Sequence, residues 1–178
     1  MRFPHLSLCL LLAIAFNTHA QNAISKLDAP NVVEVSPQLI TAGQPTAEAL
    51  AGLKERGVEV VIYLAPASVG DAVRDEQLIT TKQGLTFINL PIQFNHPTAA
   101  DFDTFAALMN ALGQRKLLVH CQVNMRASTM VFLYRTIYQK VAPQLAYESV
   151  SKVWQPNNTW RQFAEEQLRK HKVSFELL

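Results

Sequence analysis

The sequence predicts an α/β fold in which a mostly parallel central sheet is flanked by helices. Three observations support this. Short apolar, β-branched runs alternate with helical segments along the chain. The runs at 58–64 and 116–119 lack polar alternation, which is typical of strands buried on both faces. A tight loop containing Cys121 and then a long apolar helix follow the second run, so we expect this loop to lie between a strand and a helix.

The first twenty residues have the pattern of a secretory signal. Arg2 supplies a positive start, residues 6–16 are apolar, and Ala20 is a small residue at the expected cleavage site. An uncleaved N-terminal anchor is the alternative, but the apolar run is short for a membrane span. We therefore predict a signal peptide over 1–20, a flexible lead over 21–31 and a single domain over 32–178. The mature protein should be periplasmic or secreted, without stable membrane association.

Composition narrows the classes of partner and cofactor. The 178 residues include 16 Lys and Arg against 14 Asp and Glu, and no basic run indicates a nucleic-acid partner. Cys9 lies within the signal, so Cys121 is alone in the mature chain, either as a small buried hydrophobe or as a working thiol. His120 and Cys121 are adjacent and no second cysteine accompanies them, so we expect no metal and no cofactor. The oligomeric state stays open.

Turn and capping residues divide the first half of the domain. Pro37 separates two short β-prone runs, and Thr46 is a good N-cap for the helix that Gly57 ends. A second helical segment ends at Gly84. The elements expected here, in chain order, are strands at 32–35 and 39–42, a helix at 47–56, a strand at 58–64 and a helix at 71–83.

Similar signals divide the second half. Thr98 and Asp101 have the spacing of a capping box, and Gly113 follows the helix that they begin. Pro143 suits the first turn of a helix. The elements expected here are a strand at 85–92, a helix at 98–112, a strand at 116–119 and helices at 127–141, 143–153 and 159–171.

The loop from Cys121 to Arg126 has the composition of an anion cradle. Its amides and the first turn of the following helix present unpaired N–H groups, and the helix dipole makes that point positive. A thiolate at Cys121 would be stabilised there, and Arg126 could grip an oxyanion with two donors. Because ligands bind beyond the carboxyl ends of parallel strands, the loops at 65–70 and 94–97 should form the rim of this pocket.

These residues resemble a known family. The pair His120-Cys121 followed by Arg126 and a helix is similar to the signature of cysteine-dependent protein tyrosine and dual-specificity phosphatases. The wider pattern is closest to the phosphatase-like domain found alone in bacteria and at the front of beta-lactamase hydrolase-like proteins. The segments that carry the resemblance are Ile40-Thr41-Ala42-Gly43-Gln44-Pro45-Thr46, residues 57–64, Leu90-Pro91-Ile92 and the cysteine loop.

The resemblance implies a role for each loop residue. Cys121 would attack phosphorus and form a phosphocysteine, while Arg126 and the loop amides would bind the phosphoryl oxygens. His120 would orient the loop, and Asn124 stands where the family has a glycine with positive φ. The substrate would be a phosphate ester or another small anion. The residues expected to form its binding site are His120, Gln122, Val123, Asn124, Met125, Ala127 and Ser128.

Three departures from the family pattern leave the reaction open. Four residues separate Cys121 from Arg126 where phosphatases have five, and four is the spacing of rhodanese-type sulfurtransferases. The hydroxyl expected directly after the arginine comes one place late, at Ser128. The loop 93–97, where phosphatases carry an acidic proton donor, has no carboxylate, and His96 is the best substitute unless it is only an exposed loop histidine. A sulfurtransferase with a Cys121 persulfide and a catalytically weak anion-binding protein are therefore the alternatives.

Overall fold

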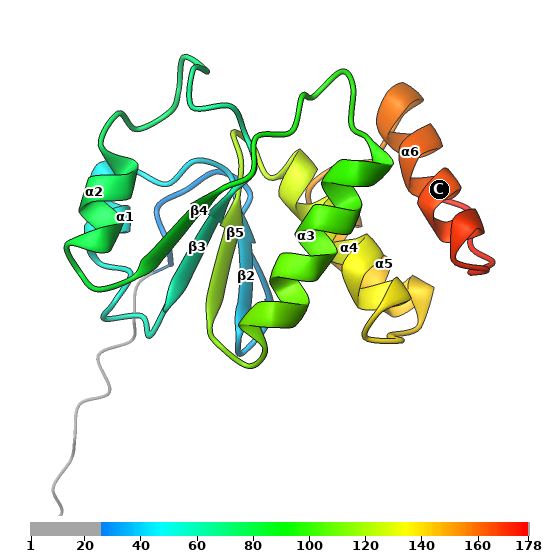
Figure 1. Ribbon diagram of the computed structural model, residues 1–178, viewed down its shortest axis with the longest axis horizontal. Coiled ribbons are helices and arrows are strands. Elements are labelled where there is room, and N and C mark those ends of the chain that lie inside the picture. Colours follow the sequence, from blue (N-terminus) through cyan, green and yellow to red (C-terminus); the bar gives the residue numbers. More distant parts are fainter. Residues whose placement is uncertain (1–25, 178) are drawn as a thin grey trace, which may run out of the picture.

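A five-stranded sheet forms the centre of the described part of the chain. The computed structural model describes residues 26–177, so the predicted signal at 1–20 lies outside the described residues. The strand order is β1-β2-β5-β3-β4; β1 pairs antiparallel with β2 and every other pair is parallel, which confirms the mostly parallel sheet (Figure 1). The strands are β1 Val33–Ser36, β2 Leu39–Ala42, β3 Val60–Tyr63, β4 Thr86–Asn89 and β5 Leu117–His120.

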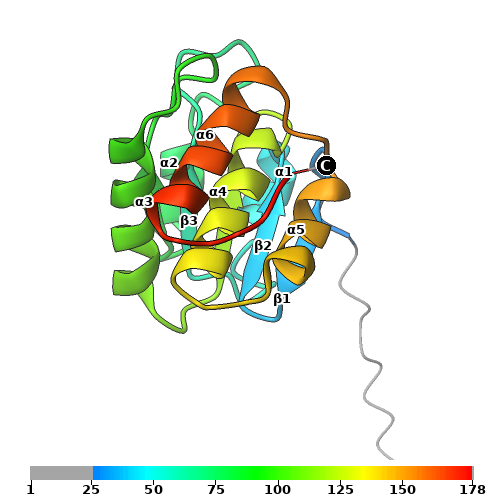
Figure 2. The same ribbon diagram turned by 90° about the vertical axis from the view of Figure 1, so that its right-hand side faces the viewer.

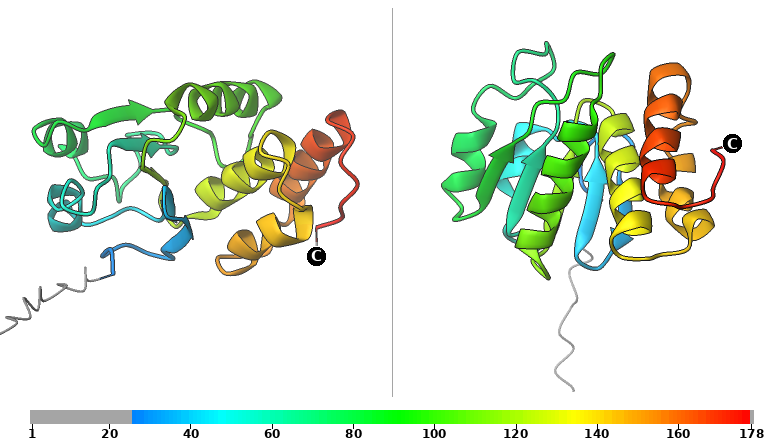
Figure 3. Two further views of the ribbon diagram at one scale, coloured as in Figure 1. Left: turned by 90° about the horizontal axis from the view of Figure 1, so that it is seen from below. Right: turned by 45° about the vertical axis from the view of Figure 1, so that its right-hand side comes forward.

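Helices cover both faces of this sheet (Figure 2 and Figure 3). One face carries the short helices α1 and α2, and the other carries α3 to α6, with α4 packed on the sheet. This arrangement confirms the flanked α/β fold predicted from the sequence. The helices are α1 Ala47–Ala51, α2 Glu76–Thr81, α3 Ala99–Leu112, α4 Met125–Ile137, α5 Pro143–Ser151 and α6 Asn158–Lys170.

The strand pleat divides the apolar core into two parts. Successive side chains of a strand point to opposite faces, so Leu118 of β5 joins the smaller core with Leu50 and Leu53, whereas Val119 joins the larger one. The larger core includes Phe102 of α3 and Trp160 of α6, both almost fully buried. Burial on both faces explains why β3 and β5 are continuously apolar in sequence.

The structure confirms the predicted helix starts at which a threonine side chain caps the helix, those of α1 and α3. Thr98 accepts from the amide of Asp101, whose carboxylate accepts from the amide of Thr98, so the predicted capping box is present. Thr46 caps α1 with a single bond, in which its hydroxyl accepts from the amide of Ala49 at 3.1 Å. The helix predicted over 71–83 is shorter, because residues 71–75 form turns and α2 begins only at Glu76. The amides of Ala72 and Glu76 donate to carbonyls three residues back, which is turn geometry rather than α-helix.

The described end of the predicted lead belongs to the fold. The amide of Gly43 donates to the carbonyl of Pro30 at 2.7 Å, and the amide of Thr46 donates to the carbonyl of Asp28 at 3.1 Å. Leu27 is only 5% exposed and packs in the smaller core. The expectation of a flexible lead is therefore wrong for residues 26–31, since these long-range hydrogen bonds cannot be read from local composition.

The carboxyl ends of the four parallel strands meet at one edge of the sheet. The loops that follow β3, β4 and β5 all rise from this edge, and β5 is the middle strand, between β2 and β3 (Figure 1). The loop after β5 therefore lies between the segment that follows β2 and the loop that follows β3. Within the described residues, no helix combines the length and apolar character that crossing a membrane requires.

Candidate active site

Cys121 lies at the centre of this edge, directly after β5. Its side chain is 1% exposed, and its amide donates to the carbonyl of Ala42 at 3.2 Å, which ties the loop to the end of β2. Helix α4 begins at Met125, two residues earlier than the sequence predicts, so Arg126 belongs to its first turn. The nucleophile candidate and the arginine are thereby placed at the same helix N-terminus.

Asn124 is the residue that shapes the loop. It precedes α4 with φ of 72°, the left-handed conformation that the sequence predicts for this position. Its side chain makes no capping bond to the helix; instead Nδ2 donates to the carbonyl of Asn31 at 2.6 Å and to Oγ1 of Thr41 at 3.1 Å. The first amides of α4 therefore lack the usual side-chain acceptor and are left for an anion.

Gly43 lets the N-terminal segment and the Cys loop approach each other. A Cβ atom at this position would lie 2.7 Å from both the carbonyl oxygen of Gln122 and Cβ of Pro30. The amide of Gln44 then donates to the same carbonyl of Gln122 at 2.9 Å. The Gly-Gln-Pro segment singled out in the sequence thus holds one side of the loop in place.

Arg126 carries a buried positive charge. The residue is 4% exposed, and its guanidinium carbon lies 5.1 Å from the ring centre of Phe94, a cation–π distance. Nη1 and Nη2 donate to Oε1 of Gln122 at 3.4 and 3.5 Å, which are long hydrogen bonds. Among the described residues, none of the ion pairs involves Arg126 and its Nε has no acceptor.

Two tryptophans hold Phe94 over the arginine. Nε1 of Trp160 donates to the carbonyl of Phe94 at 2.7 Å, and the two rings are 5.8 Å apart. Trp154 makes the second ring contact with Phe94, and the centres of these two rings are 6.2 Å apart. The loop at 93–97 therefore forms part of the rim, as expected, but it presents an aromatic ring to Arg126.

His96 is placed differently from the side chains around the Cys loop. It is exposed, and its amide donates to the carbonyl of Gln93 within its own turn. No hydrogen bond, ion pair or ring contact joins its imidazole to another residue in the described chain. Its assignment as proton donor stays a prediction.

His120 is fixed by a buried polar network that the sequence did not reveal. Its Nε2 lies 2.7 Å from Oε1 of Glu76, while Oε2 of Glu76 accepts from Nε2 of Gln44 at 2.8 Å. The imidazole also stacks on the ring of Tyr63 at 4.7 Å. These contacts come from α2, β3 and the turn after β2, and they suit a residue that orients the loop.

The charged groups around the site act on the pKa of Tyr63. The pKa of its phenol is raised to about 12, mainly by burial and in smaller part by the charges of Glu76, Asp71 and Cys121, whereas Arg126 acts to lower it. Tyr63 is 2% exposed, and its hydroxyl has no hydrogen-bond partner among the described residues. All four charged groups therefore act on one point at the end of β3.

Asp71 is a second carboxylate at this edge, and the sequence placed it inside a helix. It is exposed in the turns after β3, and its Oδ1 accepts from Nε2 of Gln122 at 2.8 Å. Gln122 therefore bridges Asp71 and Arg126. The rule that ligands bind beyond the strand ends could have drawn attention to this loop, but nothing local identifies the contact partner.

The remaining predicted binding residues divide between rim and interior. Val123 is 40% exposed at the rim, and Ala127 is fully buried in the larger core. The hydroxyl of Ser128 donates to the carbonyl of Met125 at 3.2 Å, one turn back along α4. Ala127 and Ser128 are thus buried at the start of α4, and the binding roles expected for these residues stay predictions.

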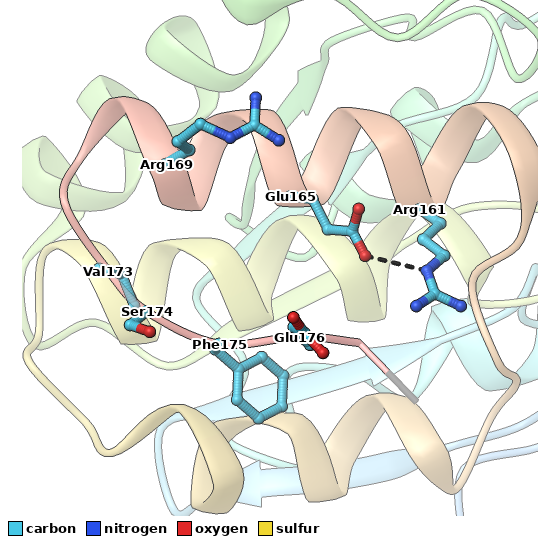
Figure 4. A pocket seen from close by; sticks show the side chains of 7 residues that line it. All are labelled: Arg161, Glu165, Arg169, Val173, Ser174, Phe175 and Glu176. Carbon is cyan, nitrogen blue, oxygen red and sulfur yellow. Dashed lines mark hydrogen bonds and ion pairs between the residues drawn. The ribbon is translucent and has the colours of Figure 1, made fainter.

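Other features of the described chain lie outside this site. The described residues contain no group of three or more His, Cys, Asp or Glu side chains that could hold a metal ion. A cavity of about 450 Å³ lies between α6 and the C-terminal segment, and no residue of the Cys loop lines it (Figure 4). Its side chains include Arg161, which is paired with Glu165 at 2.9 Å.

Solved structures of similar fold support a phosphatase relationship. A candidate phosphatase of the DUF442 family from Shewanella putrefaciens CN-32 is 28% identical; the match covers 80% of this chain and 94% of that chain, with a TM-score of 0.74. The core catalytic domain of a PP-IP phosphatase from S. cerevisiae, in complex with citrate, is 14% identical over 78% and 86% with a TM-score of 0.64. A variant of P. aeruginosa TpbA in complex with pTyr is 19% identical over 82% and 91% with a TM-score of 0.59. The last two likenesses show the fold alone.

The family comparison covers almost the whole chain. No curated protein matches this chain. The family described as "DSP-PTPase phosphatase fused to NAD+ Kinase" matches residues 17–171, a span that includes the full sheet and the Cys loop. The chain therefore belongs to this family of DSP-PTPase phosphatases, which confirms the resemblance of its His120-Cys121 loop to cysteine-based tyrosine and dual-specificity phosphatases.

Proposed function

We propose that the protein is a phosphoric monoester hydrolase that works through Cys121 and Arg126. The Cys121 thiolate attacks phosphorus, and the phosphoryl group stays on sulfur until water releases it as phosphate. Arg126 and the amides at the start of α4 hold the phosphoryl oxygens and stabilise the charge that develops on them.

The buried guanidinium of Arg126 is the observation that carries this proposal. A charged group that is 4% exposed and lacks a carboxylate partner among the described residues is costly to bury. Its long bonds to Gln122 are weak enough to be exchanged for bonds to an incoming anion. A phosphoryl group at this point would also meet the open helix N-terminus that Asn124 leaves uncapped.

The substrate that these features favour is a small phosphate ester. Two structural relatives are described in complex with pTyr and with citrate, both of which carry negative charge. The exposed faces of Phe94 and Val123 at the rim would contact the organic part of the ester. We expect aryl phosphates to be accepted because the Phe94 ring offers an apolar surface beside the cradle.

The experiment compares 4-nitrophenyl phosphate hydrolysis with vanadate binding in three variants. Cys121→Ser should abolish hydrolysis yet keep vanadate binding, because the amides and Arg126 remain. Arg126→Ala should lose both. Arg161→Ala, an arginine of α6 that is paired with Glu165, is the matched control and should change neither.

Two other outcomes would overturn the proposal in different ways. Thiosulfate can pass one sulfur to Cys121 and release sulfite; a cyanide-sensitive mass increase of one sulfur, without hydrolysis of any phosphate ester, would identify a sulfurtransferase. Neither activity, together with vanadate binding that Arg126→Ala removes, would identify an anion-binding protein. Acid-quenched turnover should instead trap a phosphorylated peptide that contains Cys121.

A further inference from the structure

We propose that Asp71, in the turns between β3 and α2, is the general acid of this site, an inference that rests on the proposed phosphatase function. The loop at 93–97 contains no carboxylate, so a carboxyl group that protonates the leaving group must lie elsewhere in the chain. Asp71 is the carboxylate that touches the Cys loop from the solvent side.

The contact with Gln122 places this carboxylate at the mouth of the cradle. Oδ1 of Asp71 lies 2.8 Å from Nε2 of Gln122, the residue directly after Cys121, and the other end of the same amide meets Arg126. When Cys121 attacks a phosphate ester, the sulfur and the leaving oxygen lie on opposite sides of phosphorus. Because the sulfur is at the bottom of the cradle, the leaving oxygen faces outward. An exposed carboxyl group one side chain away from the guanidinium is on that side.

The other candidates for a proton donor are placed less well. Glu76 is 4% exposed, and its two oxygens are engaged by His120 and Gln44. His96 has no contact with the Cys loop among the described residues. Asp101 holds the start of α3 through the capping box. Asp71 is left as a group that is both free to face solvent and joined to the loop.

The two half-reactions then balance through one carboxyl group. In the first, the sulfur–phosphorus bond forms, the phosphorus–oxygen bond of the ester breaks, and the Asp71 carboxyl gives its proton to the leaving oxygen, so the alcohol departs neutral. In the second, water attacks the phosphocysteine, the Asp71 carboxylate takes a proton from that water, and phosphate and the Cys121 thiolate are released.

The substitution Asp71→Asn tests this role without disturbing the loop. The asparagine carbonyl can still accept from Nε2 of Gln122, so only proton donation is lost. We expect kcat/KM for phenyl phosphate, whose leaving group is poor, to fall about 10²–10⁴-fold, with a much smaller fall for 4-nitrophenyl phosphate, because kcat/KM reports only the steps up to formation of the phosphocysteine. Asp75→Asn, an exposed aspartate of the same turns, is the matched control and should leave both rates unchanged.

The outcomes separate this inference from the proposed function. If the unaltered protein hydrolyses phosphate esters in a Cys121-dependent way, but Asp71→Asn lowers kcat/KM equally for both substrates or for neither, Asp71 is not the acid. A leaving-group-dependent loss in His96→Ala with none in Asp71→Asn would move the role to His96. Absence of Cys121-dependent hydrolysis in the unaltered protein would overturn the proposed function, and this inference with it.

Discussion

Replacing Asn124 with alanine should destabilise both the fold and the anion cradle. Asn124 is fully buried, has φ of 72°, and makes two hydrogen bonds that join the loop to Asn31 and Thr41. Alanine tolerates left-handed backbone less well than asparagine and offers no donor. The carbonyl of Asn31 and the hydroxyl of Thr41 would then lose a partner in a largely buried place.

The expected magnitude follows from these two losses. A left-handed conformation costs an ordinary residue about 1–2 kcal/mol. Each lost hydrogen bond costs about 0.5–1.5 kcal/mol, and more where the partner stays buried and unsatisfied. Asn124→Ala should therefore lower the free energy of unfolding by about 3.5 kcal/mol, the sum of one backbone and two hydrogen-bond contributions at the middle of these ranges. Asn124→Gly removes the backbone part and should cost about 2 kcal/mol.

The assay is urea unfolding of the two variants beside a matched control. Asn158→Ala is that control, because Asn158 also has positive φ, 41°, but is exposed and makes no side-chain hydrogen bond to a described residue. It should lose only the backbone part. Vanadate affinity should fall in Asn124→Ala and stay unchanged in Asn158→Ala.

Two results would refute the role given to Asn124. A loss below about 1 kcal/mol in Asn124→Ala would mean that the hydrogen bonds to Asn31 and Thr41 contribute little net stability. An equal loss in the alanine and glycine variants would mean that the backbone conformation at this position carries no strain.

Three further predictions concern the rim, the buried phenol and the N-terminus. Phe94→Ala should weaken vanadate binding about 2–30-fold, measured by calorimetry, because a cation–π contact contributes about 0.5–2 kcal/mol; unchanged affinity would argue against it. The pKa of Tyr63 is raised to about 12 from 10.0, so folding favours the protonated phenol, and that stability is lost as pH rises from 10 through 12. Urea unfolding at pH 9 and 11 should show a smaller fall for Tyr63→Phe, and an unchanged fall would count against this assignment. Mass spectrometry of a periplasmic extract should find Gln21 as the first residue, whereas retained Met1 in a membrane fraction would contradict a cleaved signal.

The features that the sequence predicted well depend on residues close together in the chain. Cys121 and Arg126 lie at the same strand–helix junction because one strand, one tight loop and one helix follow each other directly. The cap at Thr98 likewise depends on the side chain and its immediate neighbours, so the residue type and spacing were enough to predict it. The positive φ of Asn124 was instead expected from the resemblance to phosphatase loops, which have a glycine at this position.

The features that were missed depend on contacts between distant segments. Glu76 looked like an ordinary residue within a helix, yet its carboxylate is buried against His120, which lies 44 positions later in the chain. The helix predicted from residue 71 begins only at Glu76, and the five residues before it form the turns that carry Asp71 to Gln122. Helical composition is a weak preference, and tertiary contacts override it here.

Glu76 and Asp71 show how burial gives two carboxylates at one edge different uses. Glu76 touches the imidazole of His120 and accepts from Gln44 away from solvent, so moving it would leave buried polar groups without partners. Asp71 faces solvent and makes one hydrogen bond, to a side chain that itself turns toward Arg126. Only the second can change partners when a ligand arrives without breaking buried contacts. The fixed carboxylate therefore suits positioning of the loop, and the exposed one suits proton transfer to a bound ester.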